Sequence, residues 1–105
     1  MRVAISSVLL VFAGSLSAAA ASDCPAWRRF DLAAKNAEVA GMISGHLNSN
    51  TSKKFTSENK AAIRRCLNNF APQIVEEIDQ ACTDRPGASA EFVDDIFDRY
   101  FLSCI

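Results

Sequence analysis

The sequence predicts a small all-α domain, a bundle of three to four helices stapled by disulfides. Apolar residues recur at steps of three and four over much of the chain, which is the periodicity of amphipathic helices. Four cysteines in a short chain with an export signal are typical of two disulfides. Segments rich in Asn, Ser, Gly or Pro separate the periodic stretches and predict the turns between helices.

Residues 1–21 have the pattern of a secretory signal peptide. Arg2 is followed by the apolar run VAISSVLLVFAGSL and then by small residues. The run is short and wrongly flanked for a membrane span, so we expect no stable membrane insertion. Small residues at alternate positions fit cleavage after Ala21, and cleavage after Ala20 fits nearly as well. We expect a single helical domain at 22–105, periplasmic or secreted, and the alternative is a buried N-terminal helix.

The charge of the mature chain is nearly balanced but unevenly spread. Loss of Arg2 leaves ten Lys or Arg against twelve Asp or Glu, a net charge of −2 that does not favour nucleic acid as a partner. Residues 22–71 hold eight cations and four acids, whereas 72–105 hold eight acids and two cations. These halves can pair within one chain or across a homodimer, or they can be ordinary solvated helix faces.

The first helix is expected over residues 23–47. Asp23 can accept a hydrogen bond from a first-turn N–H, and Pro25 lies where a missing N–H costs little. Its predicted inward face consists of Phe30, Ala33, Ala37, Ala40, Ile43 and Leu47. The polar run NSNTSKK at 48–54 then predicts a loop.

The central helix is expected over 57–82, with Thr56 or Ser57 as its N-cap. Its apolar stripe consists of Ile63, Cys66, Leu67, Phe70, Ile74, Ile78, Ala81 and Cys82. Pro72 interrupts the helix, so we expect a kink or a break near 70–71. Because the stripe continues in phase, both halves are predicted to pack on the same partner.

The last helix is expected to begin after a turn at 83–89, with Ser89 as its N-cap. Its stripe is the densest in the chain and consists of Phe92, Val93, Ile96, Phe97, Tyr100, Phe101 and Cys104. This spacing is typical of a core face. The same aromatic and aliphatic residues, from Phe92 to Phe101, are our candidates for binding an unfolded client or a partner protein.

Helix length predicts how the cysteines pair. Cys66 to Cys82 spans about 24 Å of helix, and Ser89 to Cys104 spans about 22 Å at the same rise. An antiparallel hairpin through the 83–89 turn therefore brings Cys104 back beside Cys66. Cys24 is left for Cys82. Each closed loop contributes roughly 4 kcal/mol in the chain-entropy model, and a core of this size is marginal without such staples.

The residues of common catalytic and metal sites are not arranged in any recognisable motif. The chain has no GxSxG, HExxH, glycine-rich phosphate loop or EF-hand loop. His46 is the sole histidine, near the end of the expected first helix. The carboxylates of Asp94, Asp95 and Asp98 share a helix face and could bind a cation loosely, but they lack the turn geometry of a calcium site. We therefore expect a protein without enzymatic activity, catalytic residues, metal or cofactor.

The chain resembles the HdeA family of periplasmic acid-stress chaperones. The resemblance is carried by Cys24 with the nearby Trp27, by AEVAGMISGHLN at 37–48, and by PQIVEEIDQACTDRPGASAEF at 72–92. It implies a small helical fold with a disulfide matching Cys24 to Cys82. It also implies a neutral-pH homodimer that opens in acid and binds unfolding client proteins.

The family's usual cysteine pair leaves Cys66 and Cys104 without a counterpart, and a second disulfide is expected to resist acid-induced opening. A second resemblance, to the Rap/Tai-type periplasmic immunity proteins, is carried by GMISG at 41–45, the Arg85-Pro86 turn and an aromatic-rich last helix ending in cysteine. It implies a specific inhibitor of a secreted toxin. A structural exported protein is the third alternative.

Overall fold

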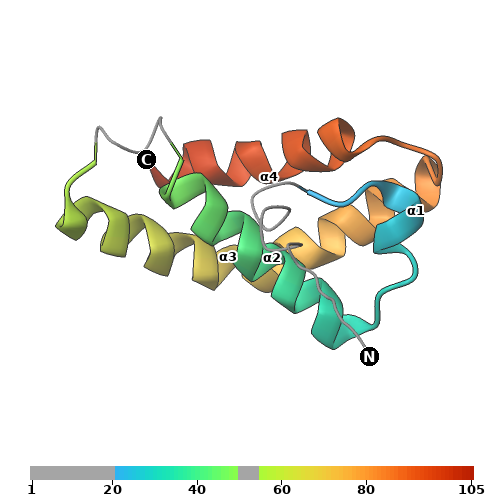
Figure 1. The fold of residues 1–105 in the computed structure, drawn as a ribbon, viewed down its shortest axis with the longest axis horizontal. Helices are drawn as coiled ribbons and strands as arrows, with labels where there is room; N and C mark the ends of the chain where they lie inside the picture. Colours follow the sequence, from blue (N-terminus) through green and yellow to red (C-terminus); the bar gives the residue numbers. More distant parts are fainter. Residues whose placement is uncertain (1–20, 50–54) are drawn as a thin grey trace, which may run out of the picture.

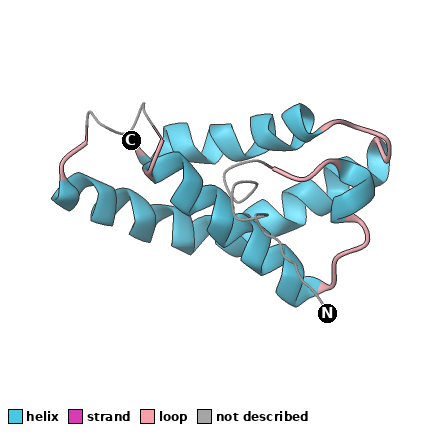
Figure 2. Cartoon of the chain, in the orientation of Figure 1, coloured by secondary structure: helices cyan, strands magenta, loops and turns pink. Residues whose placement is uncertain are grey.

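The computed structural model describes residues 21–49 and 55–105, which form four helices (Figure 1). In chain order the helices are α1 (Cys24–Trp27), α2 (Leu32–Leu47), α3 (Ser57–Asp84) and α4 (Ala90–Cys104). The described residues contain no strand, as Figure 2 shows, so the predicted all-α fold is confirmed. The expected signal peptide lies outside the described residues, apart from Ala21.

The structure divides the expected first helix into α1 and α2, so the prediction of one continuous helix is wrong. Asp23 caps α1 as predicted, because its side chain accepts a hydrogen bond from the Ala26 N–H at 2.9 Å. Asp31 has extended backbone and begins α2 by accepting a hydrogen bond from the Ala34 N–H at 2.9 Å. A second N-cap residue eight positions after the first therefore starts a new helix.

The predicted inward face of α2 is also partly wrong. Three alanines of that face are exposed, namely Ala33, Ala37 and Ala40. The buried side chains of α2 are Val39, Met42, Ile43 and Leu47. Burial of Val and Met removes more apolar area from water than burial of Ala, so these larger residues determine which face of α2 turns inward.

Of the kink or break expected near 70–71, the break is absent, because α3 is one helix through Pro72. The ribbon of α3 changes direction near its middle in Figure 1, as a kink would produce. Pro72 has no N–H for the carbonyl of Asn68, and both residues lie on the exposed side of the helix. Thr56 caps α3 by accepting a hydrogen bond from the Asn59 N–H at 3.1 Å. The predicted stripe is confirmed as the inward face, with Ile63, Leu67, Ile74, Ile78 and Cys82 buried. Its other three members, Cys66, Phe70 and Ala81, are half-buried, and Val75, which was not predicted, is buried beside them.

α4 returns antiparallel to α3 and closes the predicted hairpin (Figure 1). The structure joins Cys66 to Cys104, with 5.8 Å between their Cα atoms, as the matched helix lengths predict. It joins Cys24 to Cys82, with 5.2 Å between their Cα atoms. Both predicted pairings are confirmed.

The two disulfides do not reach α2. They join α1 to α3 and α3 to α4, whereas α2 contains no cysteine. α2 crosses α3 and packs against it, as Figure 1 shows. Apart from its two chain connections, α2 is therefore held by packing and by non-covalent polar contacts alone.

Candidate functional site

An apolar hollow lies where the end of α2, the start of α3 and the end of α4 meet. Its volume is about 620 Å³. It is lined by His46, Phe55, Asp94, Asp98, Phe101, Leu102 and Ile105. Leu102 and Ile105 are 65% and 59% exposed, so large apolar side chains meet solvent here beside two carboxylates. Such an apolar surface with a polar edge suits contact with another protein.

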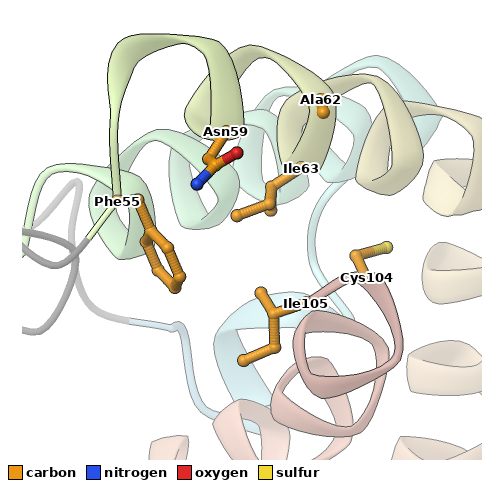
Figure 3. A pocket seen from close by; sticks show the side chains of 6 residues that line it. All are labelled: Phe55, Asn59, Ala62, Ile63, Cys104 and Ile105. Carbon is orange, nitrogen blue, oxygen red and sulfur yellow. The ribbon is translucent and has the colours of Figure 1, made fainter.

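A second hollow, of about 240 Å³, shares Phe55 and Ile105 with the first. Figure 3 shows that the side chains of Phe55, Ile63 and Ile105 point into the same opening, between the start of α3 and the end of the chain. Cys104, which forms a disulfide with Cys66, lies at the edge of this opening. The two hollows therefore form one apolar surface at this end of the bundle.

The six residues that were predicted to bind a client or partner occupy different environments. Three of them are buried in the core, namely Val93, Ile96 and Phe97. Phe92 is half-buried beneath the Arg85 guanidinium, whose carbon lies 4.5 Å from the ring centre. Tyr100 is half-buried against Phe70, with 5.4 Å between ring centres. Of the six, Phe101 alone lines the larger hollow.

Three apolar residues of the hollow were missed from the sequence. Phe55 follows a polar loop segment and precedes the helix cap, so it belongs to no periodic stripe. Leu102 lies off the inward stripe of α4, and Ile105 follows the end of that helix. All three are large apolar residues outside the helical periodicity. This property predicts that they lie on the surface, but it does not predict that they lie next to one another.

His46 connects α2 to α4 at the edge of the larger hollow. Its Nε2 lies 3.0 Å from Asp98 Oδ1 and 3.9 Å from Asp94 Oδ1. Its Nδ1 lies 3.0 Å from the carbonyl oxygen of Met42, one turn earlier in α2. The sequence places His46 and Asp98 52 positions apart, so their proximity was not predicted.

Packing and charge both constrain this cluster. The His46 ring packs against Phe97 and Phe101, with centroid separations of 4.6 Å and 5.4 Å. Burial raises the pKa of Asp94, and the nearby charge of Asp98 raises it further, while His46 acts in the opposite direction. The ring orientation is therefore fixed, and the two carboxylates repel each other across the helix face.

Asp79 holds both α1 and α2 on α3. Its Oδ1 lies 2.8 Å from Lys35 Nζ and accepts a hydrogen bond from Trp27 Nε1 at 2.8 Å. The Lys35 ammonium also lies 5.8 Å from the centre of the Trp27 ring. Burial opposes ionisation of Asp79, but the hydrogen bonds from Lys35 and Trp27 outweigh it and lower the pKa of this carboxyl.

Two further carboxylates connect separate segments. Glu38 on α2 accepts hydrogen bonds from the backbone N–H and the hydroxyl of Ser22, both at 2.9 Å. Glu77 on α3 accepts hydrogen bonds from the Tyr100 hydroxyl and the Arg99 guanidinium on α4. The Glu77 hydrogen bond, aided by burial, raises the pKa of Tyr100. Carboxylates therefore occur in contacts between several pairs of segments.

No family model matches the chain, and no curated protein or solved structure matches it either. The resemblances to the two periplasmic families therefore rest on the residues quoted above. Among residues 21–49 and 55–105, no helix combines the length and apolar character needed to cross a membrane. Two disulfides are typical of a protein from an oxidising compartment.

Proposed function

We propose that this protein is an HdeA-like acid-stress chaperone of the periplasm, which binds unfolding proteins through apolar helix faces that acid uncovers. The observation that carries the proposal is the attachment of α2. This helix has no disulfide, and the polar contacts of its first half, made by Lys35 and Glu38, each include a carboxylate. The proposal includes a neutral-pH homodimer and no enzymatic activity.

Acid removes these contacts because their carboxylates become neutral. The folded structure lowers the pKa of Asp79, so its contribution is present above the unfolded pKa and is lost as pH falls through the lowered value. At about pH 2 the twelve carboxylates are mostly protonated, and ten Lys or Arg with one His bring the side-chain total near +11. Lys35, only 18% exposed, then has no anion beside it, which favours its return to water.

Loss of α2 would uncover the core face of the hairpin. His46 of α2 packs on Phe97 and Phe101. α2 also packs against α3, and the larger residues of α2 are buried. The hydrogen bond from Arg64 to Ser44, at 3.3 Å, joins α2 to α3 without a carboxylate, but it is exposed and contributes little. The apolar residues of α4 that were predicted to bind clients then become accessible in part.

The second disulfide does not prevent this opening. It joins Cys66 of α3 to Cys104 of α4, and the first joins α1 to α3. Acid opening is therefore limited to α2, which detaches from its N-terminal end while α1, α3 and α4 stay together. We expected a second disulfide to resist opening because we assumed that the whole chain opens. In this proposal only α2 opens, and neither disulfide includes α2.

The test follows the oxidised protein from pH 7 to pH 2 by sedimentation velocity, hydrophobic-dye binding and amide hydrogen exchange. We expect dimer loss and dye binding in the carboxylate range, with amides of α2 losing protection before those of α3 and α4. The same samples should keep an acid-unfolded client soluble. A matched control, Glu76→Gln, removes an exposed carboxylate of α3 and should leave the transition unchanged.

A protein that keeps one oligomeric state, binds no dye and fails to protect a client is not a chaperone of this kind. The toxin-binding immunity function, or a structural role, would then be the better hypothesis. Saturable binding of a single folded toxin at neutral pH would select the immunity function between those two.

A further inference from the structure

Two helices bring three metal-ligating side chains together at the edge of the larger hollow. His46 comes from α2, and Asp94 and Asp98 come from successive turns of α4. One ligand atom from each residue lies within 4.8 Å of the other two. This grouping combines an imidazole nitrogen with two carboxylate oxygens, a donor set that suits zinc and similar divalent ions.

The hydrogen bonds of His46 leave one nitrogen directed at the carboxylates. Nδ1 faces the carbonyl oxygen of Met42 at 3.0 Å, and a carbonyl oxygen only accepts hydrogen bonds. Nε2 faces Asp98 Oδ1 at 3.0 Å, which in its ionised form also only accepts. A neutral imidazole carries a single N–H and can donate to only one of these two oxygens, so the other nitrogen needs a second proton or a metal ion.

We propose that His46, Asp94 and Asp98 form a binding site for a divalent cation, with zinc as the best fit, that links α2 to α4. In a tetrahedral zinc site, ligand atoms lie about 3.3–3.6 Å from one another. The observed separations from His46 Nε2, 3.0 Å and 3.9 Å, lie on either side of that range. The two carboxylate oxygens lie within 4.8 Å of each other, so closing the site requires the Asp side chains to move toward a common point.

The surroundings of the cluster fit this role. With a metal ion on Nε2, Nδ1 would carry the proton and donate to the Met42 carbonyl oxygen at 3.0 Å, the outer contact that commonly orients a zinc-binding histidine. Phe97 and Phe101 hold the ring in place. Three protein ligands leave a position for water, and the adjoining hollow of about 620 Å³ has room for it.

Charge also favours a cation at this point. The ionised carboxylates of Asp94 and Asp98 place two negative charges on successive turns of α4, with ligand atoms within 4.8 Å of each other. A divalent ion offsets both charges, whereas a proton on His46 offsets only one. The metal would also fasten α2, the helix that the disulfides leave unattached, and this effect does not depend on the chaperone proposal.

The test uses the oxidised protein, expressed with its leader, purified after export and treated with a chelator. Zinc is added at pH 7 while the heat of binding and the thermal midpoint are recorded. We expect one equivalent of saturable zinc and a higher midpoint. Cobalt(II) in place of zinc should give the visible absorption of a four- or five-coordinate ion, and zinc should shift the imidazole nitrogen resonances of His46.

Variants decide whether the named residues are the ligands. Asp94→Asn and Asp98→Asn should each weaken zinc binding by about tenfold or more, since loss of even an outer contact weakens such sites tenfold. Asp95→Asn is the matched control, because it removes the same charge from the exposed neighbouring position of α4. Circular dichroism of each variant confirms that it is folded, and these two ligand variants avoid disturbing the packed His46 ring.

Two results would overturn the proposal. The first is the absence of saturable zinc binding at pH 7. The second is equal zinc affinity in all three variants, which would indicate adventitious binding to an acidic surface. Both readouts are made without any client protein, so failure of the chaperone proposal and failure of the metal proposal are distinguishable.

Discussion

Replacement of Asp79 tests how α1 and α2 are held on α3. Asp79→Ala removes the acceptor of the Trp27 indole N–H and the anion beside Lys35. Trp27 is fully buried, so its N–H loses its hydrogen bond away from water, which costs about 1–3 kcal/mol. The Asp79 side chain is 44% exposed, so loss of its ion pair adds only about 0.2–1 kcal/mol. The expected total is therefore about 1–4 kcal/mol.

Asp79→Asn separates the two contributions. Its amide oxygen can still accept the Trp27 hydrogen bond, whereas the charge beside Lys35 is lost. We expect a loss of about 1 kcal/mol or less in the free energy of unfolding, clearly smaller than for Asp79→Ala. Urea unfolding at pH 7 with both disulfides intact provides the measurement.

The difference in unfolding free energy between the wild type and Asp79→Asn should depend on pH in one direction. Because folding lowers the pKa of Asp79, the wild type gains stability over Asp79→Asn above the unfolded pKa. That gain should disappear as pH falls through the lowered pKa, and α2 amides of the variant should exchange faster at pH 7. The reasoning is refuted if both substitutions have equal effects at pH 7, or if the advantage of the wild type over Asp79→Asn does not shrink as the pH falls through the carboxylate range.

Two further predictions concern the core and the disulfides. Phe97→Ala should lower the free energy of unfolding by about 3–5 kcal/mol, because the ring is fully buried, and a denaturation midpoint close to wild type would contradict its place in the core. A limiting dithiol should open Cys66–Cys104 before Cys24–Cys82, since the first pair is half-buried and the second is fully buried. Alkylation and peptide mapping of the singly reduced species would show the order, and the reverse order would contradict this accessibility argument.

The hairpin of α3 and α4 was predictable because it depends only on helix lengths, which can be counted along the sequence. Equal lengths of helix on either side of a short turn place Cys66 beside Cys104, and this holds even with a bend at Pro72. Of the two outcomes expected at Pro72, a kink or a break, the helix does not break, because the inward stripe is continuous. Burial of residues such as Ile74 and Ile78 on the same core outweighs the cost of a proline inside the helix.

The position of α2 was not predictable by the same means. Asp31 is an N-cap only once the chain turns after Trp27, and no local residue requires that turn. The alanines of α2 also follow a helical period, so counting apolar positions includes Ala33, Ala37 and Ala40, which are exposed, together with Ile43 and Leu47, which are buried. The contact of His46 with Asp98 then depends on how α2 crosses the hairpin, since no disulfide sets that register.

The acid-sensitive contacts and the proposed cation site lie at opposite ends of α2. Lys35 and His46 are eleven residues apart, about 16 Å along the helix, so the first contact lies well away from the proposed cation. Acid would act through Asp79 and Glu38 at the first end, and a bound cation would fasten the second end.

Distant sites without shared partners usually contribute additively to stability. Asp79→Asn should therefore change the stability of the N-terminal end of α2 without changing zinc affinity, and Asp98→Asn should reduce zinc affinity while leaving the Lys35 contact intact. Equal effects of either substitution on both measurements would instead show that α2 moves as one rigid unit and that its two ends are energetically coupled.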